Sequence, residues 1–590
     1  MVRIDFCALA VISFSGFFCP AQTPGASKIV IQRNVPVTMR DGVVLRADIF
    51  RPAAEGKYPV LLQRTPYNKS GGADAGYLGA QRGYVVIIQD TRGRYASGGE
   101  WTPFVNESRD GYDTIEWAAA LPYSNGKVGM FGGSYVGATQ MLAAIAAPPH
   151  LAGICPVVTA SNYHGNWTYQ GGAFEQWFNE SWTSGLAQDT LTRRATANSN
   201  ALLYASKLPL ASYPLFDTGV PASPDGPGSL APYFLDWLAH PGYDDYWKRV
   251  SIEENYGKIA VPSLNTGGWY DIFLGGSLRN YMGIRDHGGT EAARKGQRLL
   301  VIPGGHAGMG RRIGDVDLGP NAPFHETETM LDWYDYLFKG AHNQMASEKP
   351  VKIFVLGENA WREEADWPPP EAQTVRYYLE SGGHANSLRG DGTLARAAGS
   401  HTSSDKFVYD PENPVPTRGG NLCCDSEHLE PGARDQRPVE SREDVLVYTT
   451  KPFEQAYDVT GPVSVELYAS SSAVDTDFTA KLVDVAPDGF AQNLEDSIVR
   501  ARYRDSSELP DFLNPGKVYK FTIDLFGISD VFQRGHRLRV EISSSDFPRF
   551  DRNLNTGEDQ AHGTYFVKAT NTIYHDAAHP SALILSVIPH

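Results

Sequence analysis

Cysteine is scarce in this chain, with five among 590 residues. No spacing among the five resembles a zinc site, so we expect neither a metal ion nor any other cofactor. Cys155 stands alone in an apolar stretch and is expected to be buried. Cys423 and Cys424 are adjacent and could form a vicinal disulfide or remain two thiols. In either form we expect a local feature of a loop that takes no part in catalysis.

Positive charge is also in short supply. Lysine and arginine number 52 against 68 aspartates and glutamates, which gives a formal net charge of −16. Surfaces that bind nucleic acid are usually basic, so the composition argues against a nucleic-acid partner. The chain is otherwise typical of a globular protein, 42% hydrophobic and 20% charged. Its 59 glycines and 39 prolines indicate many turns and therefore substantial β structure.

Long apolar runs are missing, except for a short one near the N-terminus. Residues 6–18 are apolar, follow Arg3 and end close to Ala21, a pattern typical of a signal peptide over residues 1–21. The run is too short to span a membrane, and we expect no membrane span elsewhere. The signal predicts export, to the periplasm or the outside of a bacterial cell. A lipoprotein signal at Cys19 is the alternative, although phenylalanines precede that cysteine where small residues are required.

The chain is too long for one hydrophobic core, so two or three domains are expected. Its first part alternates strand-like and helix-like segments, which predicts a doubly wound, mostly parallel sheet. A hairpin that turns at Asp41-Gly42 comes first. The further elements that we expect are strands at 58–63, 83–89, 259–264, 298–302 and 351–356 and helices over 110–121 and 326–338.

Two regions break this rhythm. Residues 161–258 are aromatic and helix-like, which predicts a helical cap inserted between sheet residues 27–160 and 259–366. Residues 371–590 follow a proline-rich linker and alternate apolar and polar residues in many short segments. That pattern is typical of a β-sandwich or jelly roll, the architecture of galactose-binding-like modules.

One stretch carries the strongest chemical signal. An apolar run from residue 127 ends in Gly-Gly-Ser-Tyr-Val-Gly at 132–137, and a helix-like run follows. Strand, sharp glycine turn, serine and helix form the nucleophile elbow of an α/β-hydrolase, which exposes Ser134. The usual elbow has glycine two residues after the serine, but Val136 stands there and Gly137 comes one later.

A serine hydrolase needs an acid and a histidine after the serine, each just beyond a strand. Asp271 follows the strand at 259–264, and His306 follows the strand at 298–302. His306 would take the proton of the Ser134 hydroxyl, and Asp271 would orient the imidazole. A capping aspartate and a surface histidine are the alternatives, because 15 histidines are available.

The sequence resembles the CocE/NonD hydrolases, the family of cocaine esterase, X-Pro dipeptidyl-peptidases and α-amino-acid ester hydrolases. The resemblance implies an α/β-hydrolase domain with a helical cap and a C-terminal jelly roll, and catalysis by Ser134, Asp271 and His306. The elbow of this family has the form G-x-S-Y-x-G, which accounts for the displaced glycine. The stretches that carry the resemblance lie at 39–42, 64–67, 89–94, 122–127, 132–137, 267–271 and 547–553.

The same resemblance implies an oxyanion hole and a substrate pocket. Tyr67 matches the family tyrosine whose phenol shares the oxyanion hole with the N–H after the serine, here that of Tyr135. Phe273 and Leu274 stand where α-amino-acid ester hydrolases carry carboxylates for the substrate ammonium. We therefore favour a neutral or aromatic acyl group in a pocket lined by Phe273 and Trp167. The histidine loop departs from the family because it lacks Gly-Pro-Trp before His306.

The sequence predicts an exported serine hydrolase that cleaves small-molecule carboxylic esters, with amides left open, through an acyl-enzyme. X-Pro dipeptidyl-peptidase and β-lactam (glutaryl or cephalosporin) acylase activities are the enzymatic alternatives. The non-enzymatic alternative is a carbohydrate-binding protein with a disused triad.

Residues 551–559 resemble a calcium loop with a misplaced glycine, and a polar turn is the preferred interpretation. A homo-oligomer also remains open.

Overall fold

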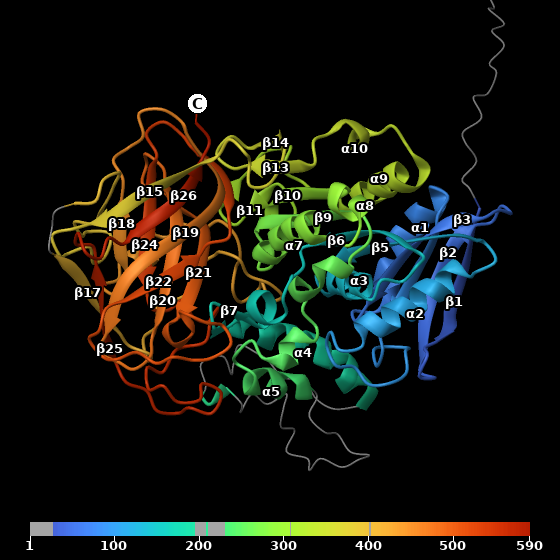
Figure 1. The fold of residues 1–590 in the computed structure, drawn as a ribbon, viewed down its shortest axis with the longest axis horizontal. Coiled ribbons are helices and arrows are strands. Elements are labelled where there is room, and N and C mark those ends of the chain that lie inside the picture. The colour runs from blue at the N-terminus through green and yellow to red at the C-terminus, as the bar shows by residue number, and fades with distance from the viewer. Residues whose placement is uncertain (1–27, 195–207, 211–230, 307, 400–402, 590) are drawn as a thin grey trace, which may run out of the picture.

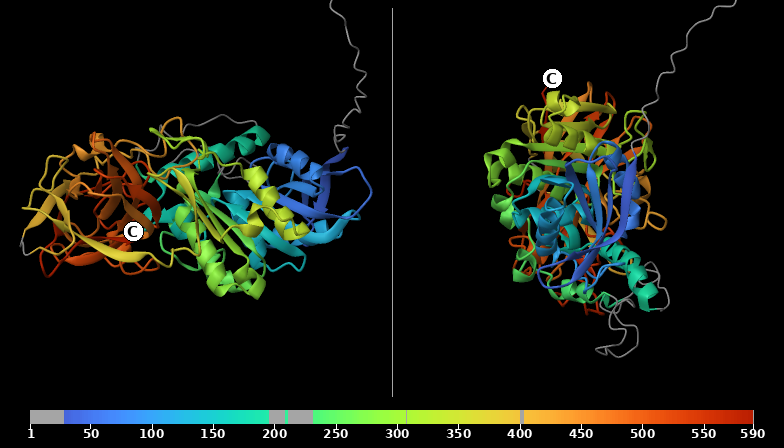
Figure 2. Two further views of the ribbon diagram at one scale, coloured as in Figure 1. Left: turned by 90° about the horizontal axis from the view of Figure 1, so that it is seen from above. Right: turned by 90° about the vertical axis from the view of Figure 1, so that its right-hand side faces the viewer.

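The computed structural model describes residues 28–194, 208–210, 231–306, 308–399 and 403–589. The predicted signal peptide lies outside these residues. Figure 1 shows two halves, a helix-and-sheet half that contains the N-terminal elements and an all-β half that contains the C-terminal ones. Seen from above in Figure 2, the halves follow each other along the long axis of the molecule. Within the described residues, no helix is both long enough and apolar enough to cross a membrane.

A ten-stranded mixed sheet forms the centre of the first half. The strands from β4 to β13 run parallel to one another, whereas β1, β2 and β14 pair antiparallel at the two edges. The predicted α/β class is therefore confirmed. In spatial order the strands are β1 (Ile29–Thr38), β2 (Val44–Pro52), β4 (Val85–Asp90), β3 (Tyr58–Thr65), β5 (Ser124–Gly133), β6 (Leu151–Val157), β9 (Ser263–Tyr270), β10 (Gln297–Gly305), β13 (Val351–Val355) and β14 (Ala360–Glu364).

Helices cover both faces of this sheet. Strand β4 shows why, because its alternate residues point to opposite faces. Val85 and Ile87 pack in one apolar cluster with residues of α2 (Glu107–Ala119) and α3 (Tyr135–Ile145). Val86 and Ile88 pack in a second cluster with residues of α1 (Ala73–Gln81) and α9 (Glu326–Lys339). A strand buried on both faces reads as a continuous apolar run, as β4 does.

The predicted hairpin and the predicted last helix are confirmed in detail. Val37 of β1 lies opposite Leu45 of β2, and Gly42 in the turn between them has a φ of 86°. Helix α9 ends at Gly340, whose φ of 66° is the left-handed conformation of a glycine C-cap. Other helices of this half are α7 (Leu274–His287), α8 (Glu291–Lys295) and α10 (Gln344–Ser347).

The described part of residues 161–258 consists mainly of helices, as predicted from its aromatic pattern. Its helices contribute many of the buried aromatic side chains in the cluster that also contains Ile115 and Met141 of the sheet-covering helices. The elements are η2 (His164–Thr168), β7 (Tyr169–Gln170), β8 (Ala173–Phe174), α4 (Gln176–Arg194), α5 (Pro232–Ala239), α6 (Asp245–Lys248) and η5 (Glu253–Lys258).

The second half is an all-β domain built on a twelve-stranded sheet, as the alternating pattern predicted. Strand β19 is its longest strand and pairs with four others, β22, β23, β25 and β26. The strands are β15 (Gln373–Glu380), β16 (Thr393–Ala395), β17 (Ser404–Tyr409), β18 (Leu446–Thr449), β19 (Tyr457–Ser471), β20 (Asp477–Val485), β21 (Ala491–Arg500), β22 (Tyr519–Asp524), β23 (Ile528–Phe532), β24 (Arg537–Ser543), β25 (Ala569–Tyr574) and β26 (Ala582–Val587).

Candidate active site

Ser134 occupies a sharp turn between β5 and α3. Strand β5 ends at Gly133, α3 begins at Tyr135, and Ser134 has a φ of 62° and a ψ of −129°. Few residues other than glycine adopt positive φ, and such strain is concentrated at functional sites. Gly132 makes the turn possible, because a Cβ atom at that position would lie 2.5 Å from Val136 Cγ1. The elbow predicted from the sequence is therefore present.

The displaced glycine of the elbow has a packing reason. A Cβ atom at Gly137 would lie 2.7 Å from the Cβ atom of Thr159, which follows β6. Real Cβ atoms do not approach so closely, so α3 needs glycine at Gly137 to pack on this segment. Val136, at the usual glycine position, instead packs over Gly132. The close approach thus occurs one residue later than in the usual elbow.

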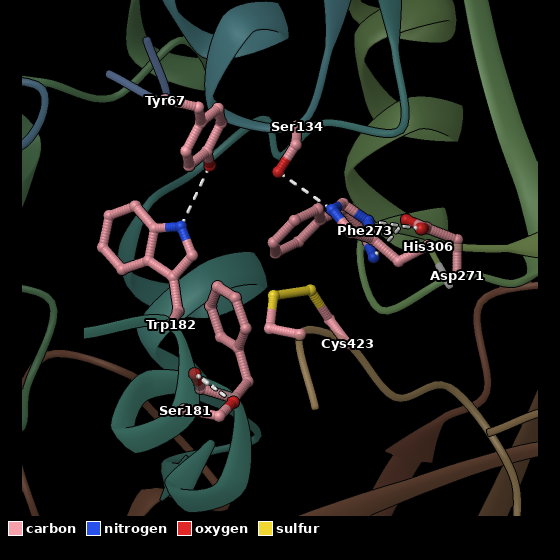
Figure 3. Close-up of a disulfide and its surroundings, with 10 residues drawn as sticks. Tyr67, Ser134, Ser181, Trp182, Asp271, Phe273, His306 and Cys423 are labelled. Atoms are coloured by element: carbon pink, nitrogen blue, oxygen red, sulfur yellow. Dashed lines mark hydrogen bonds and ion pairs between the residues drawn. A yellow bond between two sulfur atoms is a disulfide. The ribbon is translucent and has the colours of Figure 1, made fainter. Parts of the chain in front are cut away.

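The structure brings Ser134, His306 and Asp271 together. His306 Nε2 lies 2.9 Å from Ser134 Oγ, and His306 Nδ1 lies 2.8 Å from Asp271 Oδ2 (Figure 3). Asp271 is fully buried, and its Oδ1 accepts a hydrogen bond of 2.7 Å from the N–H of Phe273. These contacts fix the carboxylate and give the hydroxyl–imidazole–carboxylate order of a serine hydrolase.

Sheet topology explains how residues so far apart in sequence meet. Ser134 follows β5, Asp271 follows β9 and His306 follows β10. These strands are parallel and lie close together in the sheet, with β6 between β5 and β9. Their carboxyl ends therefore meet at one edge, which is where ligands bind in open α/β sheets.

Tyr67 follows β3 and faces the same edge of the sheet. Its Oη accepts a hydrogen bond of 2.9 Å from Trp182 Nε1 of α4 (Figure 3). Burial raises the pKa of the Tyr67 phenol, while Trp182 and the Ser134 hydroxyl act in the opposite direction. The phenol stays protonated near neutral pH as a result. Although the phenol group is surrounded by protein, the residue as a whole is about 38% exposed, so part of Tyr67 is open to a bound molecule.

Tyr135 offers its backbone to the site and anchors its side chain elsewhere. As the first residue of α3 it has a backbone N–H without a partner inside the helix. Its phenol donates to Glu107 Oε1 at 3.0 Å and accepts from the N–H of Phe104 at 2.7 Å. Glu107 is itself paired with Arg64 at 2.7 Å, and all of these groups are buried. The network holds the start of α3 in place.

Phe273 and Trp167 lie behind the histidine. Their rings stack with centroids 4.3 Å apart and an interplanar angle of 9°. Phe273 also meets the His306 ring edge to face, with centroids 5.3 Å apart. Both side chains are fully buried in the structure, so their predicted contact with substrate stays a prediction. They do form an aromatic backing for the imidazole.

Two features near the site were missed from the sequence. Cys423 and Cys424 form the disulfide that was one of the two alternatives, and its place in the candidate site, across from Ser134 and near Phe273, is what was not predicted (Figure 3). The sequence held no signal for this position, because the cysteines lie in the other half of the molecule. The hydrogen bond from Trp182 to Tyr67 was also missed, although Trp182 stands in an aromatic-rich segment.

The acidic turn at residues 551–559 is tied into the protein. Asp551 Oδ1 lies 2.9 Å from Arg500 Nη2 and accepts a hydrogen bond of 2.7 Å from the N–H of Phe174. Asn553 Nδ2 donates to Asp475 and Asp477 at 2.8 Å each. Within the described part of the chain, no group of three or more His, Cys, Asp or Glu side chains is arranged to hold a metal ion.

Comparisons with known proteins agree with this geometry. The family model of the X-Pro dipeptidyl-peptidase (S15 family) matches residues 41–308. The model of the X-Pro dipeptidyl-peptidase C-terminal non-catalytic domain matches residues 343–584. Cocaine esterase from Rhodococcus sp. (strain MB1 Bresler) is 39% identical over 585 residues, which cover 95% of this chain and 98% of that protein.

Two solved structures share the whole architecture. An aminopeptidase from a marine sediment Thaumarchaeota archaeon superposes with a TM-score of 0.82 at 26% identity, covering 99% of this chain and 100% of that chain. An α-amino-acid ester hydrolase superposes with a TM-score of 0.79 at 24% identity, covering 97% of this chain and 100% of that chain. Taken with the serine, histidine and aspartate at one sheet edge, these matches show that the chain belongs to the CocE/NonD family of serine hydrolases.

Proposed function

We propose that the protein hydrolyses carboxylic esters through an acyl-enzyme on Ser134. The observation that carries the proposal is the position of His306, which bridges Ser134 Oγ and Asp271 Oδ2 at hydrogen-bond distance from both. Nε2 takes the hydroxyl proton as the oxygen attacks the substrate carbonyl, and then gives that proton to the leaving alcohol. Water repeats the sequence to release the acid. Asp271 stabilises the charged imidazole during both steps.

The oxyanion of each tetrahedral intermediate would lie between Tyr67 and the backbone N–H of Tyr135. A phenol that stays protonated near neutral pH can donate a hydrogen bond to a developing negative oxygen. The indole N–H of Trp182 already occupies an acceptor site on the Tyr67 oxygen, so the single proton of the phenol is directed to another acceptor. Donors fixed before the reaction in this way contribute to the rate without reorganisation.

The acyl group is proposed to be neutral or aromatic. Phe273 and Leu274, both fully buried, stand two and three residues after Asp271, and neither can neutralise a substrate ammonium. Of the relatives, one is named a cocaine esterase, and this supports an ester substrate. Others are named an aminopeptidase and an α-amino-acid ester hydrolase, so peptidase or acylase action is the second candidate.

The parts around the site have proposed roles as well. We infer that the described part of residues 161–258 covers the site as a helical cap, since α4 supplies Trp182 to it. Residues 371–590 are proposed to be a jelly-roll module, supported by the C-terminal domain match. We also propose that the protein is exported by the signal at residues 1–21. Comparing secretion of the full chain with that of a chain starting at residue 22 tests this.

Ser134→Ala is the direct test of the proposed activity. We expect turnover of p-nitrophenyl acetate to fall by on the order of 10⁴-fold or more, because removal of the nucleophile blocks acyl transfer. A fluorophosphonate probe should label the parent protein and fail to label this variant. Ser347→Ala, at an exposed position in α10, is the matched control and should keep both label and turnover. Undiminished turnover in Ser134→Ala would withdraw the mechanism.

A second assay separates ester cleavage from peptidase action. The parent protein should turn over p-nitrophenyl esters far faster than X-Pro p-nitroanilides. The physical reason is that a free N-terminus needs an anionic partner, and the positions directly after Asp271 are apolar. Faster cleavage of the anilide would favour the dipeptidyl-peptidase alternative.

A further inference from the structure

One loop of the all-β half reaches into the candidate active site. The loop spans residues 420–432, and its ends are joined by two backbone hydrogen bonds of 2.9 Å between Gly420 and Gly432. Cys423 and Cys424 form a disulfide near the start of this loop. Figure 3 shows the disulfide among residues of the other half, on the side of the site opposite Tyr67 and Ser134.

The loop is fastened to both halves of the molecule. Asn421, which is fully buried, donates to Glu495 Oε1 of β21 at 2.7 Å. Just beyond the loop, Ala433 O accepts a hydrogen bond of 2.7 Å from the N–H of Asp315 in the first half. A loop held at both sides cannot drift away from the site, so the disulfide keeps a defined position on the side opposite Ser134.

The two sulfur-bearing residues have different surroundings. Cys423 is only 2% exposed and belongs to the apolar cluster that contains Trp167, Trp182 and Phe273. Cys424 is exposed. Its φ of 77° lies in the left-handed region, which side chains rarely adopt. One cysteine is therefore buried in the cluster that contains the aromatic residues of the site, and the other is open to solvent.

We propose that the Cys423–Cys424 disulfide forms a wall of the acyl pocket and that its oxidation state sets the preference between bulky and small acyl groups. This inference rests on the proposed ester hydrolysis at Ser134. When oxidised, the two side chains close a small ring with the peptide bond between them and cannot rotate. They present one fixed apolar surface beside Trp182 and Phe273, which favours a flat aromatic acyl group.

Reduction would change this wall without touching the nucleophile. A small dithiol transfers two electrons and two protons to the disulfide, the S–S bond breaks, and the dithiol closes to its own cyclic disulfide. The products are two thiols that rotate independently, with Cys424 already exposed. The aromatic acyl group then loses a preformed contact surface, whereas an acetyl group is too small to depend on it.

The test compares two esters with the same leaving group. We expect dithiothreitol to lower the ratio of kcat/KM for p-nitrophenyl benzoate to that for p-nitrophenyl acetate by roughly tenfold, the size of a lost apolar contact in a pocket. The benzoate KM should account for most of the change. Differential alkylation and mass spectrometry should find Cys423 and Cys424 unlabelled before reduction and labelled after it.

Variants assign the effect to this pair. The double variant Cys423→Ser/Cys424→Ser should have the low ratio of the reduced parent and should not respond to dithiothreitol. Cys155→Ala removes a buried free cysteine of β6 and should respond as the parent does. The experiment on the parent protein does not depend on whether the double variant folds.

The outcomes separate the two proposals. If the protein cleaves both esters and the ratio of their kcat/KM values is the same before and after reduction, the role of the disulfide is overturned and the proposed ester hydrolysis stands. Alkylation of both cysteines in the untreated protein overturns that role as well. Failure of the protein to cleave either ester, together with failure of the fluorophosphonate to label Ser134, overturns the proposed function and this inference with it.

Discussion

At the scale of single residues, the site depends on where one phenol proton points. Tyr67 Oη accepts from Trp182 Nε1, and the Ser134 hydroxyl lies close enough to lower the pKa of the phenol. The indole donor has two effects, because it fixes the orientation of Tyr67 and opposes the rise in its pKa caused by burial. In the proposed mechanism, Trp182 is thus a positioning residue for the oxyanion hole, and Tyr67 is the group that contacts the reacting oxygen.

Tyr67→Phe removes the proposed donor, and Trp182→Phe removes only its partner. We expect kcat to fall by roughly 100-fold or more in Tyr67→Phe, the usual effect of losing one oxyanion donor, and by about three- to tenfold in Trp182→Phe. KM should change little in either variant, since the interaction strengthens only in the transition state.

The double variant tests whether Trp182 acts through Tyr67. If it does, Trp182→Phe should have almost no further effect on kcat in the Tyr67→Phe background. Independent, multiplicative losses would show instead that Trp182 contributes through packing alone. Measuring both esters used above keeps this effect apart from the acyl pocket.

At the scale of elements, α3 is held by a close contact rather than by a cap. Gly137 allows the helix to approach Thr159, whose Cβ atom would be 2.7 Å from an added methyl group. We expect Gly137→Ala to destabilise the protein by about 1–3 kcal/mol through overpacking and to reduce turnover by displacing Ser134. Chemical denaturation and ester turnover measure the two effects.

Thr159→Gly provides the compensating change, because it removes the side-chain atoms nearest the added methyl group. In that background Gly137→Ala should cost less stability than it does alone. Equal costs in the two backgrounds would mean that Gly137 serves the backbone conformation of α3 and not its approach to Thr159.

Glycine also explains where the sequence-based predictions fell short. The predicted strand at 259–264 overlaps β9 only at Ser263 and Leu264, because β9 begins at Ser263 and continues to Tyr270 through Gly267 and Gly268. Glycine has a low strand propensity, so the sequence pattern placed the end of the strand before the glycines. The structure needs it there, since a Cβ atom on Gly268 would lie 2.5 Å from Gly304 O. Helix α7 was missed for the same reason, because Gly275 and Gly276 lie in its first turn.

The candidate triad could be predicted because chain order and strand ends are local signals. Ser134, Asp271 and His306 each follow a strand that the pattern revealed. The position of Cys423 in the candidate site could not be predicted, since it depends on how two halves of the molecule pack. Family resemblance identified Tyr67 but not its partner Trp182, because that contact joins a loop to a separate helix.

At the scale of the whole molecule, buried carboxyl groups couple stability to pH. Glu180 of α4 is buried, its Oε1 accepts from Gln176 at 3.1 Å, and its Oε2 has no hydrogen-bond partner in the described chain. Burial raises the pKa of Glu180 to about 8, against the smaller opposing effect of Gln176. The folded state therefore keeps a proton near neutral pH that the unfolded chain releases.

The sign of the effect follows from this difference. Stability from Glu180 is fully present below the unfolded pKa, near 4.5, and is lost as pH rises toward 8. The parent protein should lose stability between pH 5 and pH 8.5 as Glu180 ionises. In Glu180→Gln this loss should be smaller by on the order of 2 kcal/mol. Urea denaturation of parent and variant at both pH values measures it. Identical pH slopes would show that Glu180 is ionised in the folded protein.

One of the contacts between the two halves lies at the turn of residues 547–553, which carries part of the family resemblance. Arg549 is fully buried and forms an ion pair with Asp496 of β21. Two residues of the first half also meet this guanidinium. Glu175 Oε1 lies 3.7 Å from Arg549 Nη2, and Gln170 Oε1 accepts a hydrogen bond of 3.1 Å from the same nitrogen. One guanidinium therefore neutralises carboxylates from both halves.

Arg549→Met keeps much of the apolar stem but leaves Asp496 and Glu175 buried without their cation. We expect a loss of about 3–5 kcal/mol in stability, the usual cost of breaking a buried ion pair from one side. Burial already raises the pKa of Glu175 to about 8, with Arg549 opposing the rise, so Glu175 should bind a proton more readily in the variant. A protonated, neutral Glu175 is less costly to bury than a carboxylate, so the loss of stability should be smaller at pH 5 than at pH 8.

Arg376→Met is the matched control, since it removes the same kind of charge from a partly exposed pair. Arg376 Nη1 lies 2.7 Å from Glu466 Oε2, and the arginine side chain is 43% exposed. Surface pairs of this kind contribute at most about 1 kcal/mol. Urea denaturation midpoints for both variants at pH 5 and pH 8 measure how much stability each arginine contributes. If Arg549→Met costs no more than Arg376→Met at either pH, the two halves are held together by apolar packing, and the buried arginine is not what joins them.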